Sequence, residues 1–276
     1  MSGNTSEATP PRPQPQHSFP FARRINTVST TEPWNWLARG WTDLRKSKFI
    51  SLTYGLIFVL IGYAVTIGVY QLGYYYLIWP LSAGFVLVAP VFAVGIYEIS
   101  RRIEAGEPLH FIDALTSWRH VYGRILGAGL AMMFFMILWL RSAALIYVIN
   151  FPYGMLTIQN LLNHSFFTLD GLAFLTVGTI VGACFATFAF LISAVSLPMM
   201  LGERADFLPA ILTSVFAVTR NPRAMTLWGI IIIVVTAVGM MTAMIGLVIT
   251  LPLIGHATWH AYRALVKPAP IDNSSA

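Results

Sequence analysis

The feature that most constrains this chain is an apolar run at residues 132–150 that contains one arginine, Arg141. A helix of about 20 apolar residues is long enough to cross the hydrocarbon core of a bilayer. A guanidinium inside such a helix must pair with an acid, face neighbouring helices or extend to the membrane surface. The run therefore predicts a membrane-spanning helix and marks Arg141 as a candidate functional residue.

The composition extends this prediction to the whole chain. Hydrophobic residues make up 57% of the sequence and charged residues only 10%, whereas soluble domains carry roughly 25% charged residues. Lipid is therefore expected to cover most of the surface. The net charge of +6 then reflects basic residues in cytoplasmic loops, not nucleic-acid binding. The one cysteine, Cys184, excludes an intramolecular disulfide and is expected to be buried in its apolar run.

The apolar runs predict six spans, arranged as three antiparallel hairpins. The spans are residues 49–70, 77–100, 124–150 and 172–201, and two more within 224–266 that turn near 239–246. A polar segment with apolar residues three and four apart precedes each hairpin, at residues 33–48, 104–123 and 203–223. Each of these segments predicts a short amphipathic surface helix. The expected fold class is all-α, a polytopic helical membrane protein.

The two ends of the chain are predicted to lie outside this membrane domain, which covers residues 33–267. Residues 1–32 contain five prolines and no apolar stretch, so they are predicted to be a disordered cytoplasmic tail. Residues 268–276 are predicted to be a flexible C-terminal tail.

The distribution of charge predicts the orientation. With six spans and a cytoplasmic N-terminus, every lysine and arginine except Arg141 lies on the cytoplasmic side, as the positive-inside rule requires. Five spans would place Arg263 outside. An internal repeat also favours six spans, because each even-numbered span carries a proline followed by a glycine and an arginine. These prolines, Pro90, Pro198 and Pro252, are candidate helix kinks.

Four short motifs resemble a known family. They are LPLIGHATWHAYR at residues 251–263, WLR at 139–141, SLPMML at 196–201, and Trp36-x-x-x-Gly40-Trp41. Together they resemble the bacterial integral membrane family called domain of unknown function 2189, over residues 33–266. The resemblance implies a multi-span helical protein of the bacterial inner membrane, and it implies no reaction. The family usually has an aspartate after the fourth span, where this chain has Gly202-Glu203.

Some members of that family carry a cytochrome c oxidase-like label, so the histidines need attention. His256 and His260 are four residues apart on one helical face, a geometry that can hold a metal or haem iron. An aromatic and amphipathic belt at the membrane surface explains them without a metal, and this is the explanation that we favour. The other histidines lie in the tail, surface segments and loops, so no cofactor is predicted.

Arg141 lies about 25 Å along the third span from its cytoplasmic end, in the outer half of the bilayer. It can extend to the outer surface, hold an anionic lipid or solute in a cavity, or pair with Asp170, the only acidic residue in an outer loop.

The sequence contains no catalytic signature. It favours a non-enzymatic module of the lipid bilayer that binds lipid, a small solute or a partner protein, including a second copy of itself. The alternative is a transporter of small molecules or ions that uses Arg141 and the proline-broken spans. A redox protein with a metal or haem at His256 and His260 ranks third.

Overall fold

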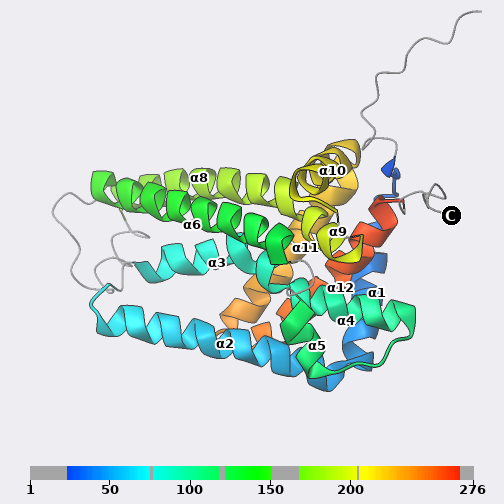
Figure 1. The fold of residues 1–276 in the computed structure, drawn as a ribbon. Helices are drawn as coiled ribbons and strands as arrows, with labels where there is room; N and C mark the ends of the chain where they lie inside the picture. Colours follow the sequence, from blue (N-terminus) through cyan, green and yellow to red (C-terminus); the bar gives the residue numbers. More distant parts are fainter. Residues whose placement is uncertain (1–23, 75–76, 118–121, 151–167, 204, 268–276) are drawn as a thin grey trace, which may run out of the picture.

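The computed structural model describes residues 24–74, 77–117, 122–150, 168–203 and 205–267, and this part of the chain is almost entirely helical. The helices are α1 (Glu32–Lys46), α2 (Lys48–Gln71), α3 (Ile78–Phe92), α4 (Val94–Ala105), α5 (Phe111–Thr116), α6 (Tyr122–Asn150), α8 (Leu169–Ser193), α9 (Ser196–Gly202), α10 (Phe207–Arg220), α11 (Pro222–Met241) and α12 (Leu247–Leu265). The long helices α2, α3, α6 and α8 run side by side, and α1, α4, α5, α9 and α10 gather at one end (Figure 1). The all-helical polytopic fold is therefore confirmed.

Five helical segments of the described chain are long and apolar enough to cross a membrane. They are Lys48–Gln71, Pro80–Ala105, Leu126–Asn150, Leu169–Gly202 and Pro222–Met241. α12 follows α11 after a turn at residues 242–246 and runs back along it. Polar side chains in the second half of α12 lower its mean hydropathy, so length and composition alone do not identify it as a membrane span. The last apolar region nevertheless forms the predicted hairpin.

The ends of the packed domain lie together, which agrees with an even number of crossings. Ile25 forms an isolated antiparallel bridge with Val266, and the Lys267 N–H donates to the Arg24 carbonyl at 2.8 Å. Residues 24–26, which belong to the predicted N-terminal tail, therefore lie against the end of α12. Residues 1–23 and 268–276, where the tails were predicted, lie outside the described residues.

Two of the three candidate kink prolines lie next to helix breaks. α3, which contains Pro90, ends at Phe92, and α4 starts after a one-residue break at Ala93. The break between α8 and α9 lies at residues 194–195, just before Pro198. Because Pro198 has no N–H, it cannot donate to the carbonyl four residues earlier. Pro252, in contrast, lies inside the continuous helix α12.

A neighbouring helix supplies the hydrogen bonds that the second break removes. The Ser214 hydroxyl of α10 donates to the Leu191 carbonyl at 2.8 Å and accepts from the Val195 N–H at 3.1 Å. These bonds satisfy buried backbone groups that the helix itself cannot pair.

The three short helices pack in a repeating pattern. α5 packs on α4, α10 packs on α8 and α9, and α1 packs on α12. α5 and α10 therefore each lie against the second span of the hairpin that precedes them in the sequence. α1, which has no preceding hairpin, lies against the second span of the last hairpin. α4, α9 and α12 also contact one another at the centre. This arrangement is what three copies of a surface helix plus a hairpin would produce.

The face of α1 that packs on the protein only partly matches the apolar residues spaced three and four apart in the sequence. Of those residues, Trp34 and Trp41 are exposed and Leu44 is buried, and Trp36 and Gly40 are buried beside it. A Cβ added at Gly40 would lie 2.7 Å from the backbone nitrogen of Ala257, so this glycine lets α1 approach α12 closely. The exposed tryptophans still suit the headgroup layer, and a separate face holds the helix to the bundle.

Candidate functional site

Both histidines singled out in the sequence lie in a buried polar cluster. His256 on α12 has no exposed surface. Its Nε2 lies 2.9 Å from the Ser51 hydroxyl of α2, and its Nδ1 lies 2.7 Å from the Ser100 hydroxyl of α4. His260, one turn further along α12, has its Nε2 2.8 Å from the Asp43 carboxylate of α1.

These groups form one continuous chain of hydrogen bonds. Ser100 donates to Asp43 Oδ2 at 3.0 Å, which links the two histidines, and the Ser47 and Ser51 hydroxyls lie 2.7 Å apart. We call this set the polar chain, and its members in order are Ser47, Ser51, His256, Ser100, Asp43 and His260. It joins α1, α2, α4 and α12.

The hydrogen bonds of the polar chain have a defined donor-to-acceptor direction. An ionised carboxylate only accepts, so the single proton of Ser100 goes to Asp43 and the Ser100 oxygen accepts from His256 Nδ1–H. A fully buried imidazole is stable in its neutral form, so His256 Nε2 is an acceptor and Ser51 donates to it. Ser51 then accepts from Ser47, whose proton is shared with the Asp43 carbonyl at 2.8 Å. The geometry thus assigns the Nδ1–H tautomer to His256.

Asp43 is the carboxylate of the polar chain and lies between Ser100 and His260. Burial alone would raise the pKa of its carboxyl, but hydrogen bonds from His260 and Ser100 and the nearby histidines together hold that pKa below its ordinary value. Asp43 is therefore ionised near neutral pH, and its charge is stabilised by contacts from α4 and α12.

The polar chain has the geometry of a structural element. Both nitrogens of His256 are occupied by serine hydroxyls, so neither is available to a metal. Among the described residues, no three histidine, cysteine, aspartate or glutamate side chains form a metal-binding group. Ser51, Ser100 and His256 have no exposed surface and border none of the cavities described below. The polar chain thus holds α1, α2, α4 and α12 together.

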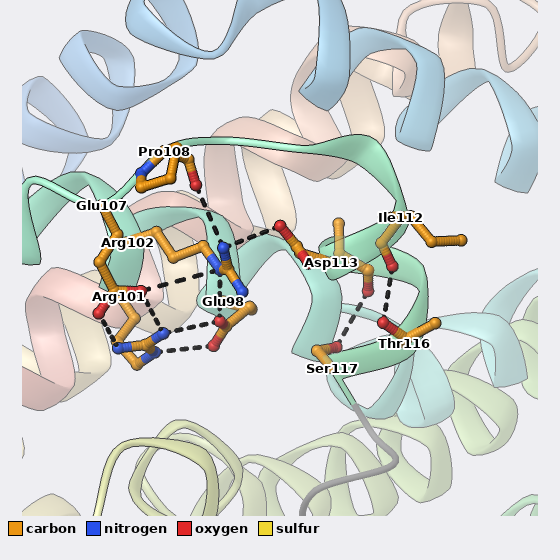
Figure 2. Close-up of polar contacts among 10 residues, drawn as sticks. Glu98, Arg101, Arg102, Glu107, Pro108, Ile112, Asp113, Thr116 and Ser117 are labelled. Carbon is orange, nitrogen blue, oxygen red and sulfur yellow. Dashed lines mark hydrogen bonds and ion pairs between the residues drawn. The ribbon is translucent and has the colours of Figure 1, made fainter.

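A second polar cluster ties α4 to α5 at the same end of the bundle. Figure 2 shows Glu98 between two guanidinium groups, with the Nε atoms of Arg101 and Arg102 each 2.8 Å from its carboxylate. Arg101 also pairs with Glu107. Arg102 lies 2.8 Å from Asp113 in an ion pair whose alignment falls short of a hydrogen bond. These two arginines are therefore neutralised by neighbouring acids.

Glu203, at the place where the family usually has an aspartate, joins both ends of the domain. Its carboxylate pairs with Arg24 at 2.6 Å and accepts from the Tyr262 hydroxyl at 3.1 Å. The acid thus fixes the N-terminal segment against α12.

No ion pair forms between Arg141 and Asp170, which was one of the three options for Arg141. Arg141 is exposed on α6 and Asp170 is exposed in the first turn of α8. Neither forms an ion pair with a residue that the structure describes. Trp139, two positions before Arg141, is buried and donates to the Pro80 carbonyl at 2.8 Å, so Arg141 lies on the opposite, outward face of α6.

Cys184, expected to be buried, is exposed on α8.

A row of three apolar cavities runs between α3 and α12. The large cavity has a volume of 260 Å³, the small cavity 30 Å³ and the break cavity, which borders both helix breaks, 90 Å³. Phe85 and Leu251 border all three, so the cavities adjoin one another. We call them together the cavity row. No lysine, arginine, aspartate or glutamate borders it, and Arg141 does not reach it.

Comparison with known proteins adds one match. A family model described as "Predicted integral membrane protein (DUF2189)" matches residues 78–202. The chain resembles DUF2189. This confirms the resemblance predicted from the sequence, over α3 to α9, and agrees with an integral membrane protein. No curated protein and no solved structure matches the chain.

Two of the motifs that resemble DUF2189 lie outside the matched residues, namely Trp36-x-x-x-Gly40-Trp41 and residues 251–263. The fold brings these two motifs into contact. Trp36 of α1 packs edge-on against Trp228, with ring centroids 5.7 Å apart, and Gly40 packs on α12 within the 251–263 motif. Sequence reasoning missed Asp43 and its serine partners. The available signal was spacing, because Asp43, Ser47 and Ser51 lie four apart, as His256 and His260 do.

Proposed function

We propose that the protein is a non-enzymatic binding module of the bacterial inner membrane whose ligand is a neutral, lipid-class molecule held in the cavity row. The observation that carries this proposal is the row itself, a set of adjoining apolar cavities inside the bundle. Its largest member approaches the ~300 Å³ at which ligand pockets commonly begin.

The apolar lining of the large cavity favours an occupied state. Apolar side chains beside an unfilled space lose van der Waals contacts. Hydrocarbon chains surround the bundle in a membrane and can restore these contacts by entering.

The large cavity also has a route to the lipid. Ile61 and Val65 of α2 border it, yet their side chains are 52% and 48% exposed on the outside of the bundle. A chain could therefore enter between α2 and α3 without crossing a polar layer. The absence of charge from the lining favours an uncharged ligand, because a buried ion without a partner is unstable.

The transporter alternative depended on Arg141, and the geometry supports it less well. Arg141 points away from α3 and α8 and borders none of the three cavities. An exposed arginine in this position suits extension to the membrane surface. Cytoplasmic termini are part of the same proposal, because the exposed basic residues Arg45, Lys46 and Lys48 flank the turn from α1 to α2 at the end of the bundle where the termini meet.

The test is native mass spectrometry of the protein purified in mild detergent. Ser82→Phe places a ring in the large cavity, and Val238→Phe places the same ring on the exposed face of α11 as a matched control. We expect wild type and Val238→Phe to retain a lipid that Ser82→Phe loses. An empty wild-type protein, or equal retention in all three, would overturn the proposal.

A further inference from the structure

Three almost fully buried polar residues border the break cavity. Tyr97 of α4, Ser193 of α8 and Trp228 of α11 are 2%, 3% and 0% exposed. The indole nitrogen of Trp228 is fully enclosed and unpaired. Folded proteins leave few buried polar groups unsatisfied, so the unpaired indole N–H of Trp228 beside this cavity indicates a missing partner.

We infer that the break cavity binds the head of an amphipathic ligand, and that this head is an uncharged oxygen group that accepts a hydrogen bond from the Trp228 indole N–H. The inference rests on the proposed function, because the tail of the same molecule would lie in the adjoining cavities. It specifies the chemical class of the ligand, namely a neutral lipid whose head carries a carbonyl, ester or hydroxyl oxygen.

The chemistry of the lining selects this class. The indole N–H can only donate, whereas the hydroxyls of Tyr97 and Ser193 can donate or accept. An oxygen acceptor therefore satisfies the one group that has no other option. Phosphate and carboxylate heads are disfavoured because no lysine or arginine borders the cavity.

The two helix breaks create the space for the head. Ala93, at the break between α3 and α4, and Ala194, at the break between α8 and α9, both border the break cavity. Phe85 and Leu251 connect it to the rest of the cavity row. The polar end of the row is therefore at the breaks and the apolar end lies toward Ile61 and Val65.

Trp36 provides a matched control. Its indole N–H is also buried and unpaired, and its ring packs on Trp228. Trp36 borders none of the three cavities. Replacing it with phenylalanine removes the same kind of donor from outside the proposed site.

The experiment compares two probes on delipidated full-length protein, methyl heptadecyl ketone and nonadecane, by native mass spectrometry. One gained hydrogen bond should favour the ketone about five-fold in wild type and in Trp36→Phe. Trp228→Phe should lose this preference while still binding the alkane. Tyr97→Phe, which removes only a hydroxyl, is a second variant if Trp228→Phe fails to fold, and should weaken the preference.

The outcomes separate the two proposals. If neither probe binds wild type and no cellular lipid copurifies, the proposed function fails. If both probes bind wild type equally, the lipid module stands and the head-group inference fails. A ketone preference that survives in Trp228→Phe, or that disappears equally in Trp36→Phe, would also overturn the inference.

Discussion

Ile25 pairs with Val266 in an antiparallel bridge, so the segment before α1 and the end of α12 meet on the same side of the bundle. Reporter fusions before residue 24 and after residue 267 should therefore report the same compartment. The positive-inside rule predicts the cytoplasm, with a fluorescent protein active at both ends and alkaline phosphatase inactive at both. Opposite results at the two ends would contradict the six-span arrangement.

Gly40 should be among the least replaceable residues of α1. A side chain there would collide with the backbone of Ala257 and separate α1 from α12. We expect Gly40→Leu to lower the free energy of unfolding by about 1–3 kcal/mol or more. Gly68→Leu is the control, because nothing lies within 4 Å of a Cβ at that site. Thermal unfolding in detergent measures both, and equal unfolding temperatures would be inconsistent with the α1–α12 contact.

Asp43 should make stability depend on acidity. The pKa of its carboxyl is lowered in the folded protein from an ordinary value of 3.8. Its contribution to stability is thus complete above that value and is lost as the pH falls through the lower folded pKa. The gap in unfolding temperature between wild type and Asp43→Asn should be widest near pH 7 and narrow below about pH 4. A gap that is independent of pH would refute the assigned role of the carboxylate.

Arg141 should be dispensable for binding. Its side chain is exposed and does not border the cavity row, so Arg141→Leu should keep the bound lipid and change the free energy of unfolding by less than about 0.5 kcal/mol. Native mass spectrometry and thermal unfolding test this together. Loss of the lipid in Arg141→Leu, with stability unchanged, would favour the transporter hypothesis instead.

The spans could be predicted from the sequence because hydropathy and helix length act locally. The expected runs at residues 49–70 and 124–150 match α2 and α6 closely. The docking of α1 could not be predicted in the same way. Periodicity identifies the most apolar face, whereas the face that packs on α12 carries Gly40 and Asp43, a small residue and a charged one.

The hydrogen bonds of the polar chain could not be predicted from local sequence patterns either. His260 and Asp43 are 217 positions apart in the sequence. Only the folded structure shows that the two side chains are hydrogen-bonded to each other. The same limit left three options open for Arg141, of which a pair with Asp170 was one, because Asp170 is the only acid predicted in an outer loop. A charge at the lipid-facing surface does not need a protein partner when it can extend to water.

The central claim is that the cavity row holds a neutral lipid. Cryo-electron microscopy of the protein in nanodiscs made from its native membrane lipid tests it most directly, with an antibody fragment bound to increase the particle size. We predict elongated density between α3 and α12 that passes Leu251 and ends beside Trp228. Side chains that close the row, or a row that is open and without density, would contradict the claim.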